Sequence, residues 1–281
     1  MAKYALENKL EPLYWPQRLK PHEFDLGIVV SFGELIDGES INNCKNGMIN
    51  MHPSLLPRWR GGAPIPRAVL AGDRETGITV VTIKPEKFDI GDILLQEVFP
   101  LPENIKAKEL FVQLGQLGAS LLVKCVENLE HYFANARPQS TQGVCYAKKL
   151  KKEDGFIDWQ LMTGPEVDRK FRGLDGFVQV YCKWFNDSTL KLFGMIDYQT
   201  VSSLKWDRAE TILYGRVIPQ PGLCFLNKRL KSLCFKCKDH SWVAFSSLCL
   251  STGPRISAVK FNRLYMKELP KPLVLPCASK G

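Results

Sequence analysis

The sequence contains no uninterrupted apolar stretch near the roughly 18–20 residues that a membrane-spanning helix needs. Residues 1–16 lack the apolar core of a secretion signal, and Glu7 and Glu11 are unlike the acid-poor composition of a transit peptide. The chain also lacks internal repeats and low-complexity tracts. From the sequence, these absences argue against a membrane-spanning protein and against a repeat architecture. At 281 residues, the chain is long enough for two globular domains.

The nine cysteines are scattered and odd in number, which argues against a disulfide framework and favours a reducing compartment. The spacing of Cys234, Cys237 and His240 could begin a zinc site. However, residues 233–238 alternate like a strand, which would direct the two thiols to opposite faces. The pattern therefore favours a hairpin with residues 239–241 in its turn, and we expect no metal.

Charge is unevenly distributed along the chain. Residues 1–146 contain 15 Lys and Arg against 17 Asp and Glu, a net charge of −2. Residues 147–281 contain 23 against 12, a net charge of +11. A nearly neutral half followed by a strongly basic half suggests chemistry in the first and polyanion binding in the second. The alternative is a solubilising charged surface.

The first half alternates strand-like and helix-like patterns, which predicts an α/β domain with a parallel, Rossmann-like sheet. Residues 26–32 are continuously apolar and predict a strand buried on both faces. Leucines at helical spacing predict one long amphipathic helix over 105–133. The remaining expected strands are 13–16, 49–52, 76–84 and 93–99. We also expect the end of a helix at 1–10, the start of a helix at 33–36 and a helix over 63–71.

The second half begins with a stretch that has no periodicity and is rich in Pro, Gln, Ser and Gly, typical of a linker. Short strand-like runs then alternate with turn residues, which favours a small barrel or sandwich, and we prefer an OB-like β-barrel. The expected elements are helix 166–172 and strands 179–184, 189–193, 213–217, 231–238 and 242–249. We therefore expect domains at 1–134 and 153–281, joined by a linker at 135–152.

The stretch 47–66, GMINMHPSLLPRWRGGAPIP, is the most informative part of the chain. Asn50 and His52 are two residues apart in a predicted strand, so their side chains share one face. Pro53 then ends the strand. Asp89 follows the next predicted strand, and we expect it at the same sheet edge as His52. Open α/β sheets build active sites at such edges, although each residue alone could have a structural role.

Two motifs together give a specific resemblance. Asn-x-His-x-Ser-Leu-Leu-Pro at 50–57, followed by Asp-x-Gly-Asp at 89–92, resembles the formyl-tetrahydrofolate transferase family. Arg-Trp-Arg-Gly-Gly-Ala-Pro-Ile at 58–65 and Lys-Glu-Asp-Gly-x-Ile-Asp-Trp at 152–159 resemble the branch that formylates methionyl initiator tRNA. The resemblance covers nearly the whole chain. Phe88 and Ile90 differ from the usual Leu and Thr of the second motif but leave its carboxylates and glycine in place.

The resemblance implies an enzyme that uses 10-formyltetrahydrofolate as the formyl donor. An oxyanion develops during such a transfer, and the attacking amine loses a proton. By resemblance, Asn50 and His52 stabilise the oxyanion, His52 assists proton transfer, and Asp89 orients the imidazole. The folate would contact Phe32, Gly33, Leu35, Ser54, Leu55, Leu56 and Pro57. Candidate RNA contacts are Arg58, Trp59, Arg60, Lys148, Lys149, Lys151, Lys152 and Arg172.

The resemblance also implies a mitochondrial matrix location and a role in translation initiation, and we expect a monomer without membrane contact. Family members begin earlier, with strands that this chain lacks at its N-terminus. We therefore expect an incomplete first domain and a chain that folds poorly or has little activity. Two alternatives remain open: a formyltransferase acting on an amino sugar nucleotide, and a non-catalytic RNA-binding remnant.

Overall fold

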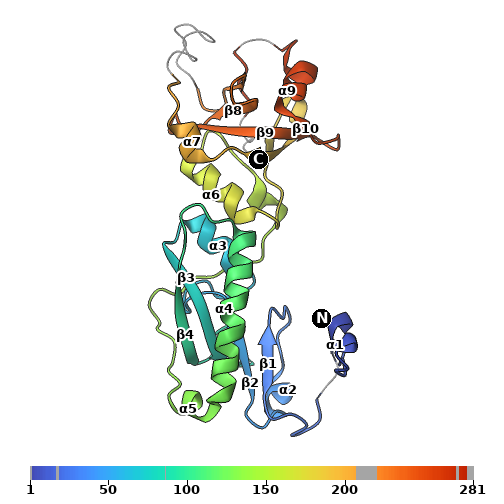
Figure 1. Cartoon of the computed structure of the whole chain (residues 1–281), viewed down its shortest axis with the longest axis vertical. Helices are drawn as coiled ribbons and strands as arrows, with labels where there is room; N and C mark the ends of the chain where they lie inside the picture. Colours follow the sequence, from blue (N-terminus) through green and yellow to red (C-terminus); the bar gives the residue numbers. More distant parts are fainter. Residues whose placement is uncertain (1, 17–18, 86, 207–219, 270–271, 277–281) are drawn as a thin grey trace. The chain divides into compact units, whose positions relative to one another are not determined.

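The computed structural model describes residues 2–16, 19–85, 87–206, 220–269 and 272–276, and these fall into two compact units (Figure 1). Each unit collects three stretches of the chain. The N-terminal unit comprises Met1–Pro64, Glu75–Pro100 and Leu114–Ala147. The C-terminal unit comprises Ile65–Arg74, Leu101–Gln113 and Lys148–Gly281. Residues far apart in the sequence therefore build each core.

The N-terminal unit contains a mixed four-stranded sheet in the order β1-β2-β3-β4. Its strands are β1 (Gly27–Val30), β2 (Met48–His52), β3 (Glu75–Thr82) and β4 (Ile93–Pro100). β1 and β2 are parallel, but β3 pairs antiparallel with both β2 and β4. The prediction of a parallel sheet is therefore wrong for β3, which runs antiparallel to both of its neighbours. The described residues of the connection 83–92 form no helix, and a parallel pair needs a longer crossover.

β1 alternates between half-buried and exposed residues, and is not buried on both faces as its apolar sequence predicted. Ile28 is 50% exposed and Val30 is 46% exposed. β1 is the end strand of the described sheet, and side chains alternate between the two faces of a strand. One face of β1 therefore stays uncovered. The predicted strand at 13–16 is also wrong, because these residues form irregular structure and a turn.

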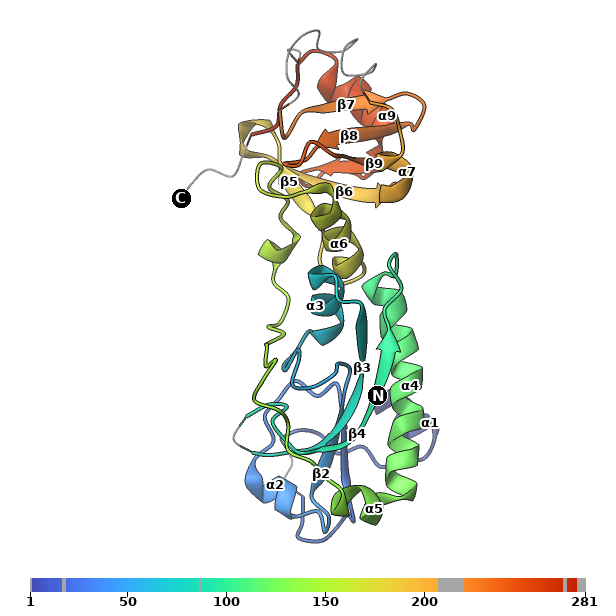
Figure 2. The same ribbon diagram turned by 90° about the vertical axis from the view of Figure 1, so that its left-hand side faces the viewer.

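The predicted long helix is divided into α4 (Ala107–Glu127) and α5 (Leu129–Ala134). The Asn128 side-chain Nδ2 donates to the Lys124 carbonyl, 3.2 Å away, and so satisfies an acceptor at the end of α4. α4 is long and apolar enough to cross a membrane by length and composition alone. Its buried stripe includes Leu110, Leu114 and Leu121. In Figures 1 and 2, α4 runs beside the sheet, and 28% of its most apolar window is buried.

The C-terminal unit contains an antiparallel sheet in the order β5-β6-β9-β8-β7, with β10 paired to β9. Its strands are β5 (Tyr181–Lys183), β6 (Thr189–Met195), β7 (Cys224–Asn227), β8 (Ser232–Lys236), β9 (Trp242–Leu250) and β10 (Ile256–Ser257). Among the described residues β5 and β7 do not pair, so the closed OB-like barrel is not confirmed. The predicted strand at 213–217 lies outside the described residues.

Short helices complete both units. They are α1 (Ala2–Glu7), α2 (Gly38–Asn42), α3 (Pro64–Ala71), η1 (Lys152–Gly155), α6 (Gly164–Leu174), η2 (Phe185–Asp187), α7 (Tyr198–Ser202), α9 (Ala258–Phe261) and η3 (Asn262–Met266). α6 begins with a capping box, in which Thr163 accepts from the Glu166 amide and Glu166 accepts from the Thr163 amide. The N-cap at Thr163 explains why α6 begins at Gly164, before the predicted residue 166.

The two cysteines considered as zinc ligands lie in separate parts of the core, as the strand pattern predicted. Cys234 packs with Trp242 and Ala244, whereas Cys237 belongs to the larger cluster around Phe235. Burial raises the pKa of both thiols to about 12, and zinc binds the deprotonated thiolate. β8 and β9 form the expected antiparallel hairpin around the turn that contains His240.

Candidate active site

β2 presents Asn50 and His52 on one face, and both contact the same carboxylate oxygen. The Asn50 amide Nδ2 donates to Asp89 Oδ1 at 3.1 Å. His52 Nδ1 lies 3.5 Å from Asp89 Oδ1. The His52 and Asp89 side chains are only 5% and 9% exposed, so water screens their interaction weakly. The structure therefore brings together an amide, an imidazole and a carboxylate, as the sequence spacing predicted.

Asp89 reaches this group by a different route from the one predicted. β3 is antiparallel to β2, with Thr79 opposite His52 and Thr82 opposite Ile49. β3 therefore ends beside the start of β2, and the two strands do not finish at a common edge. The loop after β3 must instead fold back over the face of β2 to bring Asp89 alongside Asn50 and His52.

Contacts at the end of β3 hold this returning loop. The Thr82 amide donates to the Asp92 carbonyl at 3.0 Å, and the Asp92 amide donates to Thr82 Oγ1 at 2.9 Å. A Cβ atom at Gly91 would overlap the Thr82 carbonyl, so only glycine allows this approach. Asp89 itself has φ 57°, a left-handed conformation that aspartate tolerates better than most residues.

The loop after β2 completes the surroundings of Asp89 and His52. The Gly61 amide donates to Asp89 Oδ2 at 2.8 Å. His52 Nε2 lies 2.8 Å from the Trp59 carbonyl, which can only accept, so these partners assign a proton to Nε2. A second proton taken up at Nδ1 would lie between the ring and Asp89. The arrangement can therefore hold or pass a proton on the imidazole.

Gln139 is a site residue that sequence reasoning missed. Its Nε2 donates to the Asp89 and Gly91 carbonyls, both at 2.8 Å. Its Oε1 accepts from Arg60 Nε at 3.1 Å and from Arg60 Nη2 at 2.7 Å. Gln139 thus joins the loop that carries Asp89 to the loop after β2. A single glutamine in a stretch without periodicity gave no signal, and the stretch was interpreted only as a linker.

The predicted folate-lining residues after β2 differ in exposure. Ser54 is fully buried, and its Oγ donates to the Arg58 carbonyl at 2.6 Å. Leu56 is 3% exposed and packs with Val81 and Ile93. The side chains of Ser54 and Leu56 therefore form part of the buried interior of this loop. Leu55 and Pro57 are only half-buried, and their side chains are the more accessible pair.

The other predicted folate contacts follow β1. Phe32 and Leu35 are 40% and 46% exposed, and Gly33 is also exposed. The Phe32 ring packs edge-on against Trp15, with 5.4 Å between the ring centroids. β1 is parallel to β2, with Val30 opposite Met51, so the segment after β1 leaves the sheet at the same end as His52.

The predicted RNA-contacting arginines already have protein partners. The Arg58 guanidinium lies 4.5 Å from the centroid of the Trp59 ring, and Arg60 is bound to Gln139. Arg172 donates to Asp168 at 2.8 Å and to the Ile105 carbonyl at 3.1 Å. In contrast, the four predicted lysines are exposed, namely Lys148, Lys149, Lys151 and Lys152.

Comparison with known families is consistent with this geometry. Residues 4–126 match the family described as formyl transferase, and residues 149–265 match the formyl transferase C-terminal domain. The chain therefore belongs to the formyl transferase family. It is 36% identical over 266 residues to "Methionyl-tRNA formyltransferase, mitochondrial" of Mus musculus. That alignment covers 95% of this chain and 66% of the relative, so the chain spans just under two thirds of the relative's length.

Two solved structures share the fold. HypX from Aquifex aeolicus in complex with tetrahydrofolic acid is 18% identical, with a TM-score of 0.61, over 87% of this chain and 39% of that chain. WlaRD, a sugar 3N-formyl transferase crystallised with dTDP and 5-N-formyl-THF, is also 18% identical. Its TM-score is 0.60, over 87% of this chain and 80% of that chain. At these identities the likeness supports the fold alone.

Proposed function

We propose that this chain transfers a formyl group from 10-formyltetrahydrofolate to the α-amine of methionyl initiator tRNA. The observation that carries the proposal is the shared carboxylate of Asp89, which gathers Asn50 and His52 on one face of β2. The similarity to methionyl-tRNA formyltransferases along 95% of the chain supports this acceptor. The proposed role is in translation initiation in the mitochondrial matrix.

In the proposed reaction, the methionyl amine attacks the formyl carbon and an N–C bond forms. The carbonyl oxygen becomes an oxyanion, toward which the Asn50 amide can donate a hydrogen bond. His52 accepts the proton that the amine loses. The bond between the formyl carbon and N10 of the folate then breaks, and the proton passes to N10. Asp89 orients the imidazole throughout and stabilises the charged form that exists between these two proton transfers.

The hydrogen bonds of His52 place a condition on this mechanism. Nε2 is occupied by the Trp59 carbonyl, and Nδ1 faces Asp89. One ring nitrogen must therefore be released before it can act on a substrate. Nε2 is the better candidate once the imidazole changes tautomer, so that its proton lies on Nδ1 facing Asp89 and Nε2 has the free lone pair that accepts the amine's proton. Catalytic hydrogen bonds commonly rearrange when substrate binds, so we propose that the acceptor amine displaces the Trp59 carbonyl.

We further propose that the folate donor binds beside the ends of β1 and β2. Leu55, Pro57, Phe32 and Leu35 have accessible apolar side chains that suit a pterin ring. Gly33 would allow the backbone to approach the ring. Ser54 and Leu56 act indirectly, because their buried side chains fix the shape of the loop. The reaction as proposed needs no metal ion.

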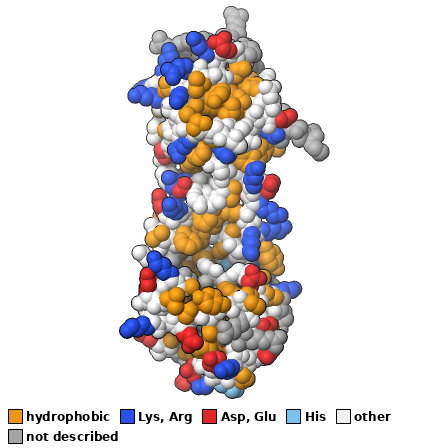
Figure 3. All heavy atoms as spheres, turned by 90° about the vertical axis from the view of Figure 1, so that its right-hand side faces the viewer, with side chains coloured by type: hydrophobic (Ala, Val, Ile, Leu, Met, Phe, Trp, Pro, Cys, Tyr) orange, Lys and Arg blue, Asp and Glu red, His pale blue; other side chains and the backbone are white. Residues whose placement is uncertain are grey.

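We propose that the C-terminal unit binds tRNA. We also propose that its antiparallel sheet belongs to an OB-like fold. Its sequence carries the net charge of +11 in residues 147–281, and phosphate neutralisation dominates RNA affinity. Figure 3 shows Lys and Arg side chains at many separate points of one face, with apolar side chains between them. We retain 1–134, 135–152 and 153–281 as the proposed functional division and propose that the protein acts as a monomer.

An amino sugar nucleotide is the second candidate acceptor, because WlaRD shares the fold over most of both chains. The basic composition of the second half favours tRNA, since a small acceptor needs no extended positive surface. Formylation assays with each acceptor separate the two proposals. Transfer to the sugar nucleotide but not to charged initiator tRNA would overturn the tRNA proposal.

The deciding experiment measures formylmethionine on charged initiator tRNA after incubation with 10-formyltetrahydrofolate. We expect His52→Ala to lower kcat by about 10²–10⁴-fold, the usual contribution of general acid–base catalysis. His131→Ala is the matched control, because His131 is exposed in α5. A His52→Ala protein as fast as the unaltered chain would overturn the mechanism. Salt-sensitive tRNA binding without transfer by the unaltered chain would instead support a non-catalytic RNA-binding protein.

A further inference from the structure

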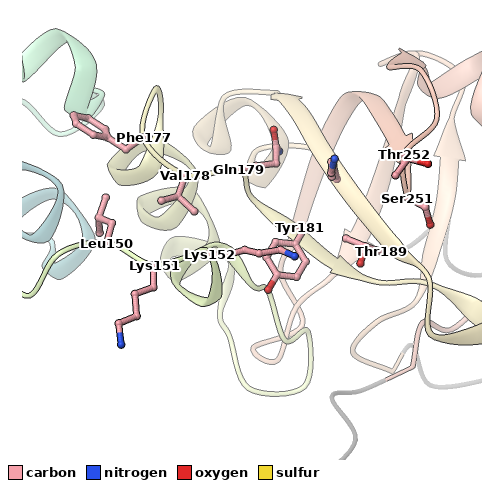
Figure 4. A pocket seen from close by; sticks show the side chains of 11 residues that line it. Leu150, Lys151, Lys152, Phe177, Val178, Gln179, Tyr181, Thr189, Ser251 and Thr252 are labelled. Carbon is pink, nitrogen blue, oxygen red and sulfur yellow. The ribbon is translucent and has the colours of Figure 1, made fainter.

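The C-terminal unit contains a pocket of about 560 Å³ that has no part in the chemistry described above. This volume lies within the roughly 300–1,000 Å³ typical of small-ligand sites. Figure 4 shows Leu150, Phe177 and Val178 toward one end and Thr189 and Ser251 toward the other. The pocket therefore has an apolar end and a hydroxyl-bearing end.

Three lysines, Lys151, Lys152 and Lys191, line the same pocket. Within the described part of the chain, none of them forms an ion pair with a carboxylate. Lys191 lies opposite Tyr181 in the β5–β6 ladder. Burial, together with the nearby Glu153 carboxylate, raises the pKa of Tyr181, so its hydroxyl remains a donor at neutral pH. The lining thus offers cations and hydrogen-bond donors to an anion.

The segment that carries two of these lysines is held in place. The Lys151 amide donates to Asp154 Oδ2 at 2.7 Å, and Asp154 receives two bonds from Arg67, at 3.0 and 3.2 Å. Lys170 Nζ donates to the Asp154 and Phe156 carbonyls, both at 2.8 Å. These contacts fix the backbone but leave the Lys151 and Lys152 ammonium groups available. A site whose backbone is ordered before binding loses less entropy when a ligand arrives.

We propose that this pocket binds one unpaired nucleotide of an RNA strand. The phosphate would meet the lysines and hydroxyl groups, and the base would lie against Phe177 and Val178. A duplex could not place a base there, because its bases are stacked and paired. The exposed Lys148 and Lys149 continue the positive charge along the chain, which favours a strand over a free nucleotide. This inference rests on the proposed RNA-binding role of the C-terminal unit.

The test measures binding of three probes to the full chain: a short single-stranded RNA, the same RNA annealed to its complement, and adenosine 5′-monophosphate. Phe177→Ala leaves the charge unchanged and should weaken single-strand binding by about fivefold or more, with little effect on the duplex. Phe111→Ala is the matched control, because Phe111 and Phe177 are 52% and 46% exposed. Lys191→Gln should reduce the steepness of the salt dependence by about one counterion, unlike Lys260→Gln at an exposed lysine outside the pocket.

Each outcome decides between interpretations. If the unaltered chain binds none of the RNA probes, the proposed RNA-binding role fails and the pocket proposal fails with it. If RNA binds but the pocket variants behave like Phe111→Ala and Lys260→Gln, only the pocket proposal fails. Tight binding of adenosine 5′-monophosphate that equals binding of the single strand would identify a free nucleotide as the ligand and overturn the RNA assignment. Unchanged thermal unfolding of the variants shows that they fold.

Discussion

At the candidate active site of the N-terminal unit, Asn50, His52 and Gln139 all bond to Asp89 or to its loop. At the pocket of the C-terminal unit, hydrogen bonds hold the backbone around Lys151 and Lys152, whereas their ammonium groups have no carboxylate partner among the described residues. The difference matches two physical tasks. Stabilising a transition state needs groups fixed in direction, whereas binding a polyanion depends mainly on the number and position of positive charges.

The sharpest test of this comparison replaces Asp89 with asparagine. Asp89→Asn keeps the shape of the side chain but removes the charge that faces His52 Nδ1 at 3.5 Å. We expect kcat for formylation to fall by about 10²–10⁴-fold, because the imidazole loses the group that orients it and stabilises its proton. Affinity for tRNA should stay the same. The comparison would be wrong if Asp89→Asn lowered the affinity for tRNA and left kcat for formylation unchanged.

Gln139→Ala tests whether the position of the loop that carries Asp89 affects catalysis in the N-terminal unit. It removes the two donors that hold the Asp89 and Gly91 carbonyls and the acceptor of Arg60. We expect kcat to fall by about 10–100-fold with little change in KM, since small displacements of a reacting group are costly. Gln139→Glu keeps an acceptor for Arg60 but removes both donors, so it should resemble alanine. Full activity in Gln139→Glu would show that the link to Asp89 is dispensable.

The sequence predicted the members of the site better than it predicted the way they come together. The period of two in β2 correctly placed Asn50 and His52 on one face. The apolar alternation of β3 says nothing about strand direction, so Asp89 was assigned to the wrong sheet edge even though its proximity to His52 was predicted correctly. Gln139 could not be found, because its four hydrogen bonds depend on two distant loops.

Fold prediction succeeded for elements that a local sequence pattern specifies. It failed for features that depend on which other elements pack or pair with a strand. The β8–β9 hairpin, expected from alternation, and α6, expected over 166–172, are both present. β1 was interpreted as fully buried because its composition is apolar, but burial also depends on what covers each face. Closure of the C-terminal sheet depends on pairing between its end strands, which composition does not encode.

In the C-terminal unit, Asp154→Asn tests how much of the lysine-bearing turn depends on charge. Burial tends to raise the pKa of Asp154, but hydrogen bonds from the Lys151 amide and Arg67 outweigh it and lower the pKa. A lowered folded-state pKa means that this stabilisation is present above the ordinary aspartate pKa and is lost as pH falls through the folded-state value. We therefore expect Asp154→Asn to cost about 1.5–3 kcal/mol of unfolding free energy at pH 7.

The measurement is denaturant unfolding of both proteins at several pH values. The difference in unfolding free energy between the two proteins should narrow as the pH falls below about 4, because the aspartate of the unaltered chain then becomes protonated. Asp187→Asn is the control, since Asp187 is 89% exposed and pairs only at the surface with Lys183. If the difference in unfolding free energy were equal at every pH, the charge of Asp154 would not be what stabilises the turn.

The smallest expected effects come from single charges at the surface of the C-terminal unit. Lys148→Gln and Lys149→Gln each remove one exposed ammonium group, and each should weaken tRNA binding by about two- to fivefold at moderate salt. kcat should not change, because neither side chain belongs to the network around Asp89. Binding measured over a range of salt concentrations should become less salt-dependent with each substitution. If one of these lysines lowered kcat as Gln139→Ala does, the separation between a fixed catalytic network and an adaptable charged surface would have to be abandoned.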